Sequence, residues 1–291
     1  MARAERMPGL ARVLLTLAAT APLPAVASGL TPMIDAHAHY TAEDAQALSA
    51  ESIMAKLDAA GVSQLVVSSA PPDRAQGLYR HAPERVIPLL GLYDTEAGKT
   101  DWMRDGRLPA LTAARLDSGC WAGLGELHLF APDADSAVFA ELVRMAAAHR
   151  LVLVLHADAE VVDKAFELAP GIRVLWAHLG TRPDPGLLAS MLQRHPDRLW
   201  VDTSVRDERI APNGKLLPDW RALFLRHPDR FLAAVDTFSL NRWQGYASTV
   251  RQIRTWTNSL PIETRRRLLH DNAAQLFGEF ADRPCRRAHA G

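Results

Sequence analysis

Met33-Ile34-Asp35-Ala36-His37-Ala38-His39 is a short apolar stretch that ends in a His-x-His pair. Its apolar residues predict a buried β-strand, and the side chains of a strand alternate between its two faces. Asp35, His37 and His39 therefore share one face, with both imidazoles at the carboxyl end of the strand. Two histidines placed in this way can bind one metal ion. The same pattern also arises by chance, so it needs support from other parts of the chain.

Seven more apolar runs follow this stretch, and helical patterns separate them. The runs are continuous in Val, Leu, Ile and Ala, which is typical of parallel strands that helices cover on both faces. Eight strand–helix units in about 250 residues predict an α/β fold, the (β/α)8 TIM barrel, whose active-site face is formed by the carboxyl ends of the strands. The predicted strands are residues 33–38, 64–68, 86–91, 122–127, 151–155, 172–177, 199–202 and 231–235.

The clearest helical patterns have recognisable ends. Ser49 precedes one of them as a capping residue, and Gly61 follows it as a stop signal. The predicted helices of this kind cover residues 49–60, 137–149, 185–194 and 263–280.

Two predicted turns share the sequence Arg-His-Pro-Asp-Arg, at residues 194–198 and 226–230. Each precedes a strand, so each lies at the amino end of the barrel, where residues serve stability rather than catalysis. We predict that His195 and His227 are turn residues and not metal ligands.

Histidines and carboxylates recur at the carboxyl ends of the predicted strands. A single inward-facing histidine is usually a hydrogen-bonded core residue. Many imidazoles and carboxylates packed together would instead repel one another or stay unsatisfied without a cation. The sequence therefore predicts a divalent metal centre at the mouth of the barrel, near His37, His39, Glu126, His128, His156, His178 and Asp236.

The order of these motifs resembles that of the amidohydrolase superfamily, in its amidohydrolase-related branch. The resemblance covers residues 33–280 and is carried by Asp35-x-His-x-His39, Gly123-x-Gly-Glu-Leu-His128, His156, Ala177-His178, Asp236 and the stretch 270–278. It implies that the metal ligands are His37, His39, His156, His178 and Asp236, and that Asp236 can also accept a proton. Glu126 lies where binuclear members of the superfamily have a bridging carboxylate.

The resemblance implies a metal-dependent hydrolase that activates a metal-bound water to cleave an amide, ester, lactone or phosphoester bond. We predict Asp236 and His178 as catalytic residues and zinc as the metal, with manganese or iron as alternatives. The centre holds one or two ions. In the binuclear form, Glu126 bridges an ion on His37 and His39 to a second ion on His156 and His178. In the alternative, Glu126 only orients a ligand histidine.

Two other functions are compatible with the same pattern. The first is a metal-dependent decarboxylase of the same branch, which uses one metal ion and needs no glutamate on the fourth strand. The second is a barrel that binds a metal or ligand and has lost catalysis. The presence of Glu126 and of the whole predicted ligand set favours hydrolysis.

Three residues are predicted to contact a small-molecule substrate. His128 follows the fourth strand and is either a substrate contact or part of the metal centre. Arg206 follows the seventh strand and can hold a carboxylate or phosphate, unless it is simply a solvated surface residue. Trp243 follows Asp236 and either lines the pocket or packs in the core.

The first 27 residues have the pattern of a secretory signal. Arg3, Arg6 and Arg12 precede an uncharged run over residues 13–27, which ends in a small-x-small sequence suited to signal peptidase. We predict a signal peptide over residues 1–27, one barrel domain over 28–291, and a periplasmic or secreted location. An N-terminal extension that is not a signal is the alternative. No other stretch is long and apolar enough to span a membrane.

Composition limits the partners. The chain has 33 basic and 33 acidic residues, so no positive field favours nucleic acid. We expect neither a nucleic-acid nor a membrane partner for the mature chain, and self-association stays open. Cys120 and Cys285 form no metal-binding motif and are either bridged or free.

Overall fold

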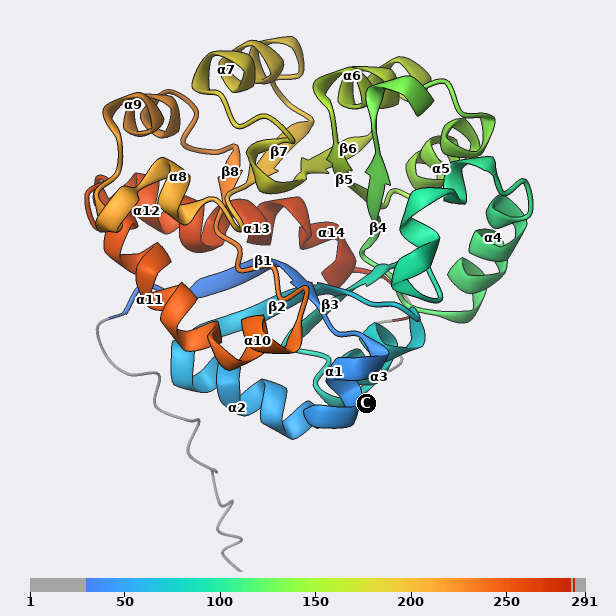
Figure 1. Ribbon diagram of the computed structural model, residues 1–291, viewed down its shortest axis with the longest axis horizontal. Helices are drawn as coiled ribbons and strands as arrows, with labels where there is room; N and C mark the ends of the chain where they lie inside the picture. Colours follow the sequence, from blue (N-terminus) through green and yellow to red (C-terminus); the bar gives the residue numbers. More distant parts are fainter. Residues whose placement is uncertain (1–29, 284, 286–291) are drawn as a thin grey trace, which may run out of the picture. The chain divides into compact units, whose positions relative to one another are not determined.

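A computed structural model describes residues 30–283 and 285. The predicted signal peptide lies outside these residues. Within them, eight parallel strands neighbour one another in chain order, and this confirms the predicted (β/α)8 TIM barrel (Figure 1). The strands are β1 (Met33–His39), β2 (Val62–Ser68), β3 (Val86–Leu90), β4 (Gly123–Leu129), β5 (Val152–Ala157), β6 (Arg173–Trp176), β7 (Leu199–Asp202) and β8 (Phe231–Leu232).

The barrel closes between β8 and β1 through single backbone hydrogen bonds. The strand β8 has two residues and ends before Val235, where the sequence predicts its end. The amide of Ala36 donates to the carbonyl of Ala233 at 3.1 Å, and the amide of Asp236 donates to the carbonyl of His37 at 2.8 Å. The second bond places the backbone of Asp236 directly beside β1.

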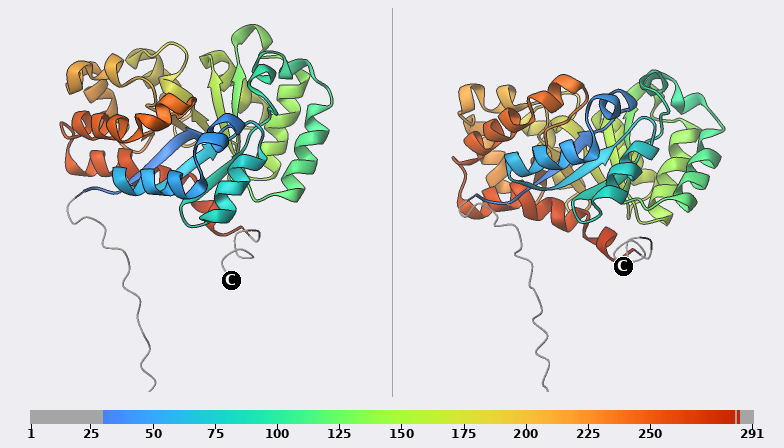
Figure 2. Two further views of the ribbon diagram at one scale, coloured as in Figure 1. Left: turned by 60° about the horizontal axis from the view of Figure 1, so that its bottom comes forward. Right: turned by 90° about the horizontal axis from the view of Figure 1, so that it is seen from below.

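Helices cover the outside of the strands (Figure 2). Ser49 caps α2 by accepting a hydrogen bond from the amide of Ser52, and Gly61 ends this helix with a positive φ of 66°. The α-helices are α1 (Ala42–Ala47), α2 (Ala50–Ala60), α3 (Asp73–His81), α4 (Leu108–Ser118), α5 (Ala137–Ala148), α6 (Ala159–Leu168), α7 (Pro185–Arg194), α8 (Asp207–Ile210), α9 (Pro218–Arg226), α10 (Leu240–Gln244), α11 (Tyr246–Thr257), α12 (Ile262–Arg266), α13 (Asn272–Leu276) and α14 (Gly278–Ala281).

Short helical turns occupy several connections. The 3-10 turns are η1 (Glu96–Thr100), η2 (Trp102–Arg104), η3 (Ala131–Asp133), η4 (Ala177–Leu179) and η5 (Pro212–Gly214), and η6 (Arg267–Asp271) is a π-helix. None of the helices within residues 30–283 has both the length and the apolar character needed to cross a membrane.

The predicted helical stretch over residues 263–280 is helical in the structure, but it is not one regular α-helix. The structure divides this segment into α12, η6, α13 and α14. The carbonyl of Leu268, inside η6, accepts a hydrogen bond from the amide of Ala233 at 2.9 Å. This amide belongs to the residue after β8, so the bond satisfies a backbone donor at the point where the strand ends.

A disulfide joins Cys120, which precedes β4, to Cys285, which follows α14. The two cysteines are 165 residues apart in the sequence, so the bond closes a long loop and fastens the end of the chain to the barrel. Of the two possibilities that the sequence leaves open, the structure has the bridged one.

We expect Cys285→Ser to lower the free energy of unfolding by about 2–5 kcal/mol, because the loop constraint on the unfolded chain is lost. Cys285 is the better site for this test than Cys120, whose side chain is buried in the core. Urea unfolding of the variant and of oxidised and reduced wild type measures the effect. Equal stability of all three would show that the disulfide does not form.

Candidate metal centre

Seven predicted residues meet at the carboxyl end of the barrel. The strand β1 supplies His37 and His39, β4 supplies Glu126 and His128, and β5 supplies His156. His178 lies in η4 directly after β6, and Asp236 follows β8. Their shared location follows from the topology, because parallel strands in a barrel direct their carboxyl ends to one rim.

Glu126 lies at the centre of this group, and its two carboxylate oxygens face different histidines. Oε1 is 3.0 Å from Nε2 of His178 and 3.1 Å from Nδ1 of His156. Oε2 is 3.3 Å from Nε2 of His39 and 3.6 Å from Nε2 of His37. Nε2 of His128 is also nearer to Oε2, at 3.5 Å. The carboxylate therefore lies between two sets of imidazole nitrogens.

Hydrogen bonds to Nδ1 orient the three most buried imidazoles. Oδ2 of Asp202 accepts from Nδ1 of His37 at 3.0 Å. The hydroxyls of two serines serve the other two rings, with Ser68 at 3.0 Å from Nδ1 of His39 and Ser204 at 2.7 Å from Nδ1 of His178. Such partners behind a ligand fix the ring and direct the opposite nitrogen toward a metal.

The inward nitrogens of His37 and His39 are only 3.1 Å apart. A carboxylate can only accept hydrogen bonds, so Asp202 requires a proton on Nδ1 of His37. In the neutral ring, Nε2 of His37 then presents a lone pair to Nε2 of His39. A positive charge between the two nitrogens, either a proton or a metal ion, stabilises their short separation.

Asp202 is a residue that sequence reasoning missed as part of the site. It is fully buried and also accepts hydrogen bonds from the amides of His178 at 3.1 Å and Ser204 at 3.0 Å. Burial by itself would raise the pKa of Asp202, but the charge and hydrogen bond of His37, together with other donors, hold this pKa at about 2. Asp202 is therefore a permanent anion behind the cluster.

The pKa values of the two central groups, His37 and Glu126, also show that a positive charge is stabilised here. Burial would lower the pKa of His37, yet the carboxylates of Glu126 and Asp202 raise it well above its usual value. Burial would raise the pKa of Glu126, yet the charge of His37 and the hydrogen bonds of His156 and His178 lower it well below the usual range. The cluster is thus built around a buried negative charge that a cation can neutralise.

Asp236 has the least satisfied carboxylate of the group. Its Oδ1 is buried and has no hydrogen-bond partner among the residues that the structure describes. This atom is 3.4 Å from Nε2 of His39, and Oδ2 is 3.9 Å from Nε2 of His178. The backbone of Asp236 has a φ of 58°, which a residue with a side chain adopts at an energetic cost. An unpaired buried oxygen on a strained residue indicates a functional carboxylate.

These donors fit a divalent metal. Three sets of ligand atoms each lie within 4.8 Å of one another, and imidazole nitrogen with carboxylate oxygen is a donor set that suits zinc. Each set includes a carboxylate, which balances part of the ionic charge. The sets are His37, His178 and Asp236; His37, His39 and Glu126; and Glu126, His128 and His156.

A cavity of about 480 Å³ opens above the cluster. Arg206 lines it, as predicted, and its Nε donates to the carbonyl of His178 at 3.0 Å. Lys99 from η1 and Phe238 from the loop after β8 also line it, and neither is predicted from the sequence, because both lie in connections rather than at strand ends. The residues that line the cavity are His39, Lys99, Glu126, His128, His156, His178, Val205, Arg206, Asp236 and Phe238.

His128 is held at the side of this cavity by two aromatic residues. Its amide donates to the hydroxyl of Tyr93 at 3.0 Å, and its carbonyl accepts from Nε1 of Trp102 at 2.8 Å. Burial lowers the pKa of His128 to about 3, so this ring is neutral. The structure therefore places His128 both in the cavity wall and within reach of Glu126.

The structure does not bring Trp243 to the cavity. Its side chain is fully buried, and its Nε1 donates to the carbonyl of His39 at 3.0 Å. The indole also stacks on Tyr246, with 5.4 Å between the ring centroids. Trp243 supports the backbone of β1 from behind and has no surface to offer a substrate.

Neither a protein-family model nor a curated protein matches the sequence. Solved structures match over most of the chain. A candidate 2-pyrone-4,6-dicarboxylic acid hydrolase from Pseudomonas putida has 19% identity and a TM-score of 0.61, with 86% of this chain and 98% of that chain covered. The fold is that of the amidohydrolases. Other structures with the amidohydrolase fold and a similar barrel come from two more bacteria.

One is a candidate 2-pyrone-4,6-dicarboxylic acid hydrolase from Acinetobacter baumannii with citric acid bound, at 13% identity and a TM-score of 0.59, with 84% of this chain and 99% of that chain covered. The other is an amidohydrolase from Burkholderia multivorans with bound zinc, at 15% identity and a TM-score of 0.56, with the same coverage of 84% and 99%. At these identities the likeness establishes the amidohydrolase fold and leaves the substrate open.

Proposed function

We propose that this chain is a metal-dependent hydrolase that cleaves an amide, ester, lactone or phosphoester bond in a small anionic molecule. The observation that carries the proposal is the position of Glu126, whose two oxygens face separate sets of histidines. A bridging carboxylate between two metal ions needs this arrangement, whereas a residue that only orients one histidine does not.

We infer that His37 and His39 would hold one ion and His156 and His178 a second, with the carboxylates of Glu126 and Asp236 available to both. Zinc is the metal that we propose, since these ligands suit it and a structure with the same fold contains it. When bound, such ions supply Lewis acidity, polarising the scissile bond and lowering the pKa of a nearby water toward neutrality.

The chain's own residues then handle the protons. Oδ1 of Asp236 has no partner among the described residues and is positioned to accept a proton from the attacking water and return it to the leaving group. Ser204 fixes the ring of His178, which would hold a metal ion directly beside the Asp236 carboxylate. Asp202 holds His37 and thereby the geometry of the centre.

The walls of the cavity support an anionic substrate. Lys99 and Arg206 bring two positive charges to its lining, and guanidinium groups bind carboxylates and phosphates well. Phe238, which is exposed, adds an apolar surface at the same cavity. Two structures with this fold are candidate hydrolases of a pyrone dicarboxylic acid, and one of them binds citric acid, so small carboxylic acids are the first substrates to test.

We expect Arg206→Ala to raise KM for anionic substrates by about 10- to 100-fold, because a hydrogen bond to a charged group contributes about 1.5–3 kcal/mol. The turnover number should change little, since the contact stabilises substrate and transition state alike. Steady-state kinetics on an anionic substrate and its neutral analogue measures the effect. Arg209→Ala is the matched control, because Arg209 is exposed and does not line the cavity. Unchanged KM in Arg206→Ala would remove this role.

A screen of zinc-loaded protein tests the proposed reaction. The panel contains lactones, esters, amides and phosphoesters with and without carboxylate groups, and chelated protein is the control. We expect metal-dependent release of a carboxylic acid or phosphate. Release of carbon dioxide from an unsaturated or aromatic acid would establish the decarboxylase instead. Tight metal binding without turnover of any compound would favour the inactive barrel.

We also propose that the protein works in an oxidising compartment, the periplasm or the cell exterior. The disulfide between Cys120 and Cys285 supports this, because disulfides persist mainly in such environments. Cell fractionation with N-terminal sequencing of the mature protein tests it. A cytoplasmic protein that retains residues 1–27 would contradict the proposal.

A further inference from the structure

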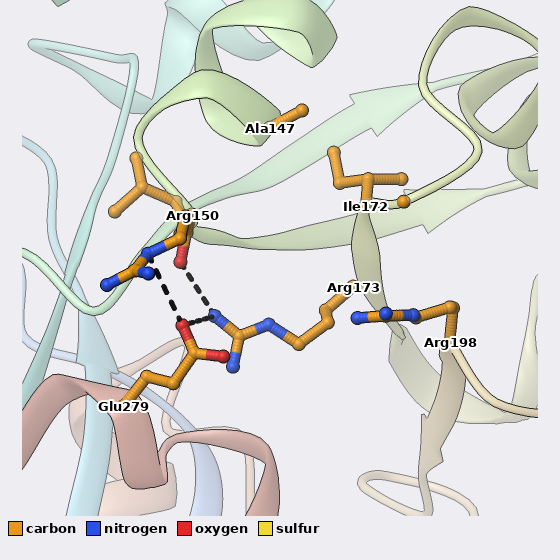
Figure 3. Close-up of a pocket in the computed structure, with 8 residues that line it drawn as sticks. Ala147, Arg150, Ile172, Arg173, Arg198 and Glu279 are labelled. Carbon is orange, nitrogen blue, oxygen red and sulfur yellow. Dashed lines mark hydrogen bonds and ion pairs between the residues drawn. The ribbon is translucent and has the colours of Figure 1, made fainter.

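A second cavity, of about 100 Å³, lies at the opposite end of the barrel from the metal centre. Figure 3 shows the side chains that line this second cavity. It is bounded by the amino ends of three consecutive strands and by α14. Arg150 precedes β5, Arg173 begins β6 and Arg198 precedes β7, while Glu279 belongs to α14. None of these residues takes part in the proposed hydrolysis.

Arg173 forms the wall of this cavity and is held rigidly. Its side chain is only 12% exposed. Nη1 donates to the carbonyl of Leu276 at 3.1 Å, and Nη2 donates to the carbonyl of Arg150 at 2.7 Å and to Oε2 of Glu279 at 3.1 Å. A positive charge is thus fixed at the cavity by contacts to three parts of the chain.

Positive charge exceeds negative charge around this point. Glu279 is shared between Arg173 and Arg150, whose Nε is 3.8 Å from Oε2. Arg283 adds another guanidinium, because its Nη2 donates to the carbonyls of His149 at 2.9 Å and Arg150 at 3.1 Å. Among the described residues that line the cavity, one carboxylate therefore faces three arginines.

Arg198 also lines the cavity, and it has no carboxylate partner among the residues that the structure describes. Figure 3 shows its side chain extending toward that of Arg173. The neighbouring Asp197 lies 3.7 Å from Arg230 instead. Burial lowers the pKa of Arg173, the carboxylate of Glu279 opposes this effect, and the positive charges of Arg198 and Arg150 add smaller lowering effects.

We propose that this cavity binds an oxyanion of the size of phosphate, held between Arg173 and Arg198 with Arg150 at the entrance. A cavity admits one water from about 10–15 Å³, so this one has room for a small tetrahedral anion but not for a nucleotide. The guanidinium of Arg198 can offer paired N–H donors to such an oxyanion, while Arg173, whose Nη atoms already donate to the chain, adds a fixed positive charge. The bound anion would link the strands β5, β6 and β7 to α14 by neutralising their shared positive charge.

Calorimetric titration of inorganic phosphate into the full-length, zinc-loaded protein tests the proposal. We expect saturable binding with a Kd of about 1 mM or lower. Arg198→Glu should weaken it at least tenfold, because the change removes a donor and places a carboxylate in the cavity. Arg198 is exposed, so the variant should keep the fold and its bound zinc, which circular dichroism and metal analysis verify.

Arg251→Glu on α11 is the matched control, since it reverses an exposed positive charge elsewhere and should bind phosphate as the wild type does. Sulfate should compete with phosphate, and chloride at equal ionic strength should not. The proposal is overturned by the absence of saturable binding, by equal weakening in the control, or by displacement with chloride. Undiminished binding in Arg198→Glu, as expected for phosphate at the metal centre alone, would also overturn it.

Discussion

Asp236→Asn should lower the turnover number by about 10²- to 10⁴-fold, the usual contribution of a general base or acid. The amide keeps an oxygen near the histidines but cannot accept a proton. Oδ1 of Asp236 has no hydrogen-bond partner among the described residues, so the substitution removes no such bond of this atom. Steady-state kinetics on a substrate from the screen measures the loss, and metal analysis on the same sample counts the ions.

Asp117→Asn is a matched control for this change, because Asp117 is an exposed carboxylate on α4. It should retain full activity. The proton-transfer role is refuted by an Asp236→Asn enzyme that turns over at the wild-type rate with a full complement of metal. Loss of both metal and activity would show instead that Asp236 acts as a metal ligand.

Glu126→Gln should remove at least one metal ion. The amide has the shape of the carboxylate but no charge, and only one of its two ends can bind a metal. Loss of an outer partner of a metal ligand already weakens affinity by about 10- to 100-fold, so loss of a bridging ligand should weaken it more. Dialysis against zinc buffers followed by elemental analysis should give two ions per chain for the wild type and at most one for the variant.

Glu160→Gln, an exposed change at the start of α6, should bind two ions like the wild type. Two tightly bound ions in Glu126→Gln would disprove the bridge. One ion in the wild type, with the same affinity in the variant, would leave Glu126 as a residue that orients His156 or His178.

The sequence predicts the barrel because strands that are buried on both faces have a recognisable pattern of continuous apolar residues. Strands such as β3 and β5 are continuous apolar runs, and the helices between them carry ordinary start and stop signals such as Ser49 and Gly61. The same topology explains why residues as distant as His37, Glu126 and Asp236 can be grouped from the sequence alone.

Pairings across the barrel are what the sequence does not reveal. Asp202 and His37 are 165 residues apart, and their hydrogen bond depends on the register of strands that no local pattern records. Trp243 shows the same limit, because an aromatic residue near a strand end can face the cavity or the core. Its indole N–H pairs with the carbonyl of His39, and this contact decides the matter. The early end of β8 likewise depends on Leu268, which lies far along the chain.

Anomalous diffraction at the zinc edge, from crystals of chelated and remetallated protein, addresses the metal centre most directly. The arrangement of ligands predicts two peaks on opposite sides of the Glu126 carboxylate, one near His37 and His39 and the other near His156 and His178. A single peak would contradict the bridge, and a map without any peak among these side chains would contradict the metal centre itself.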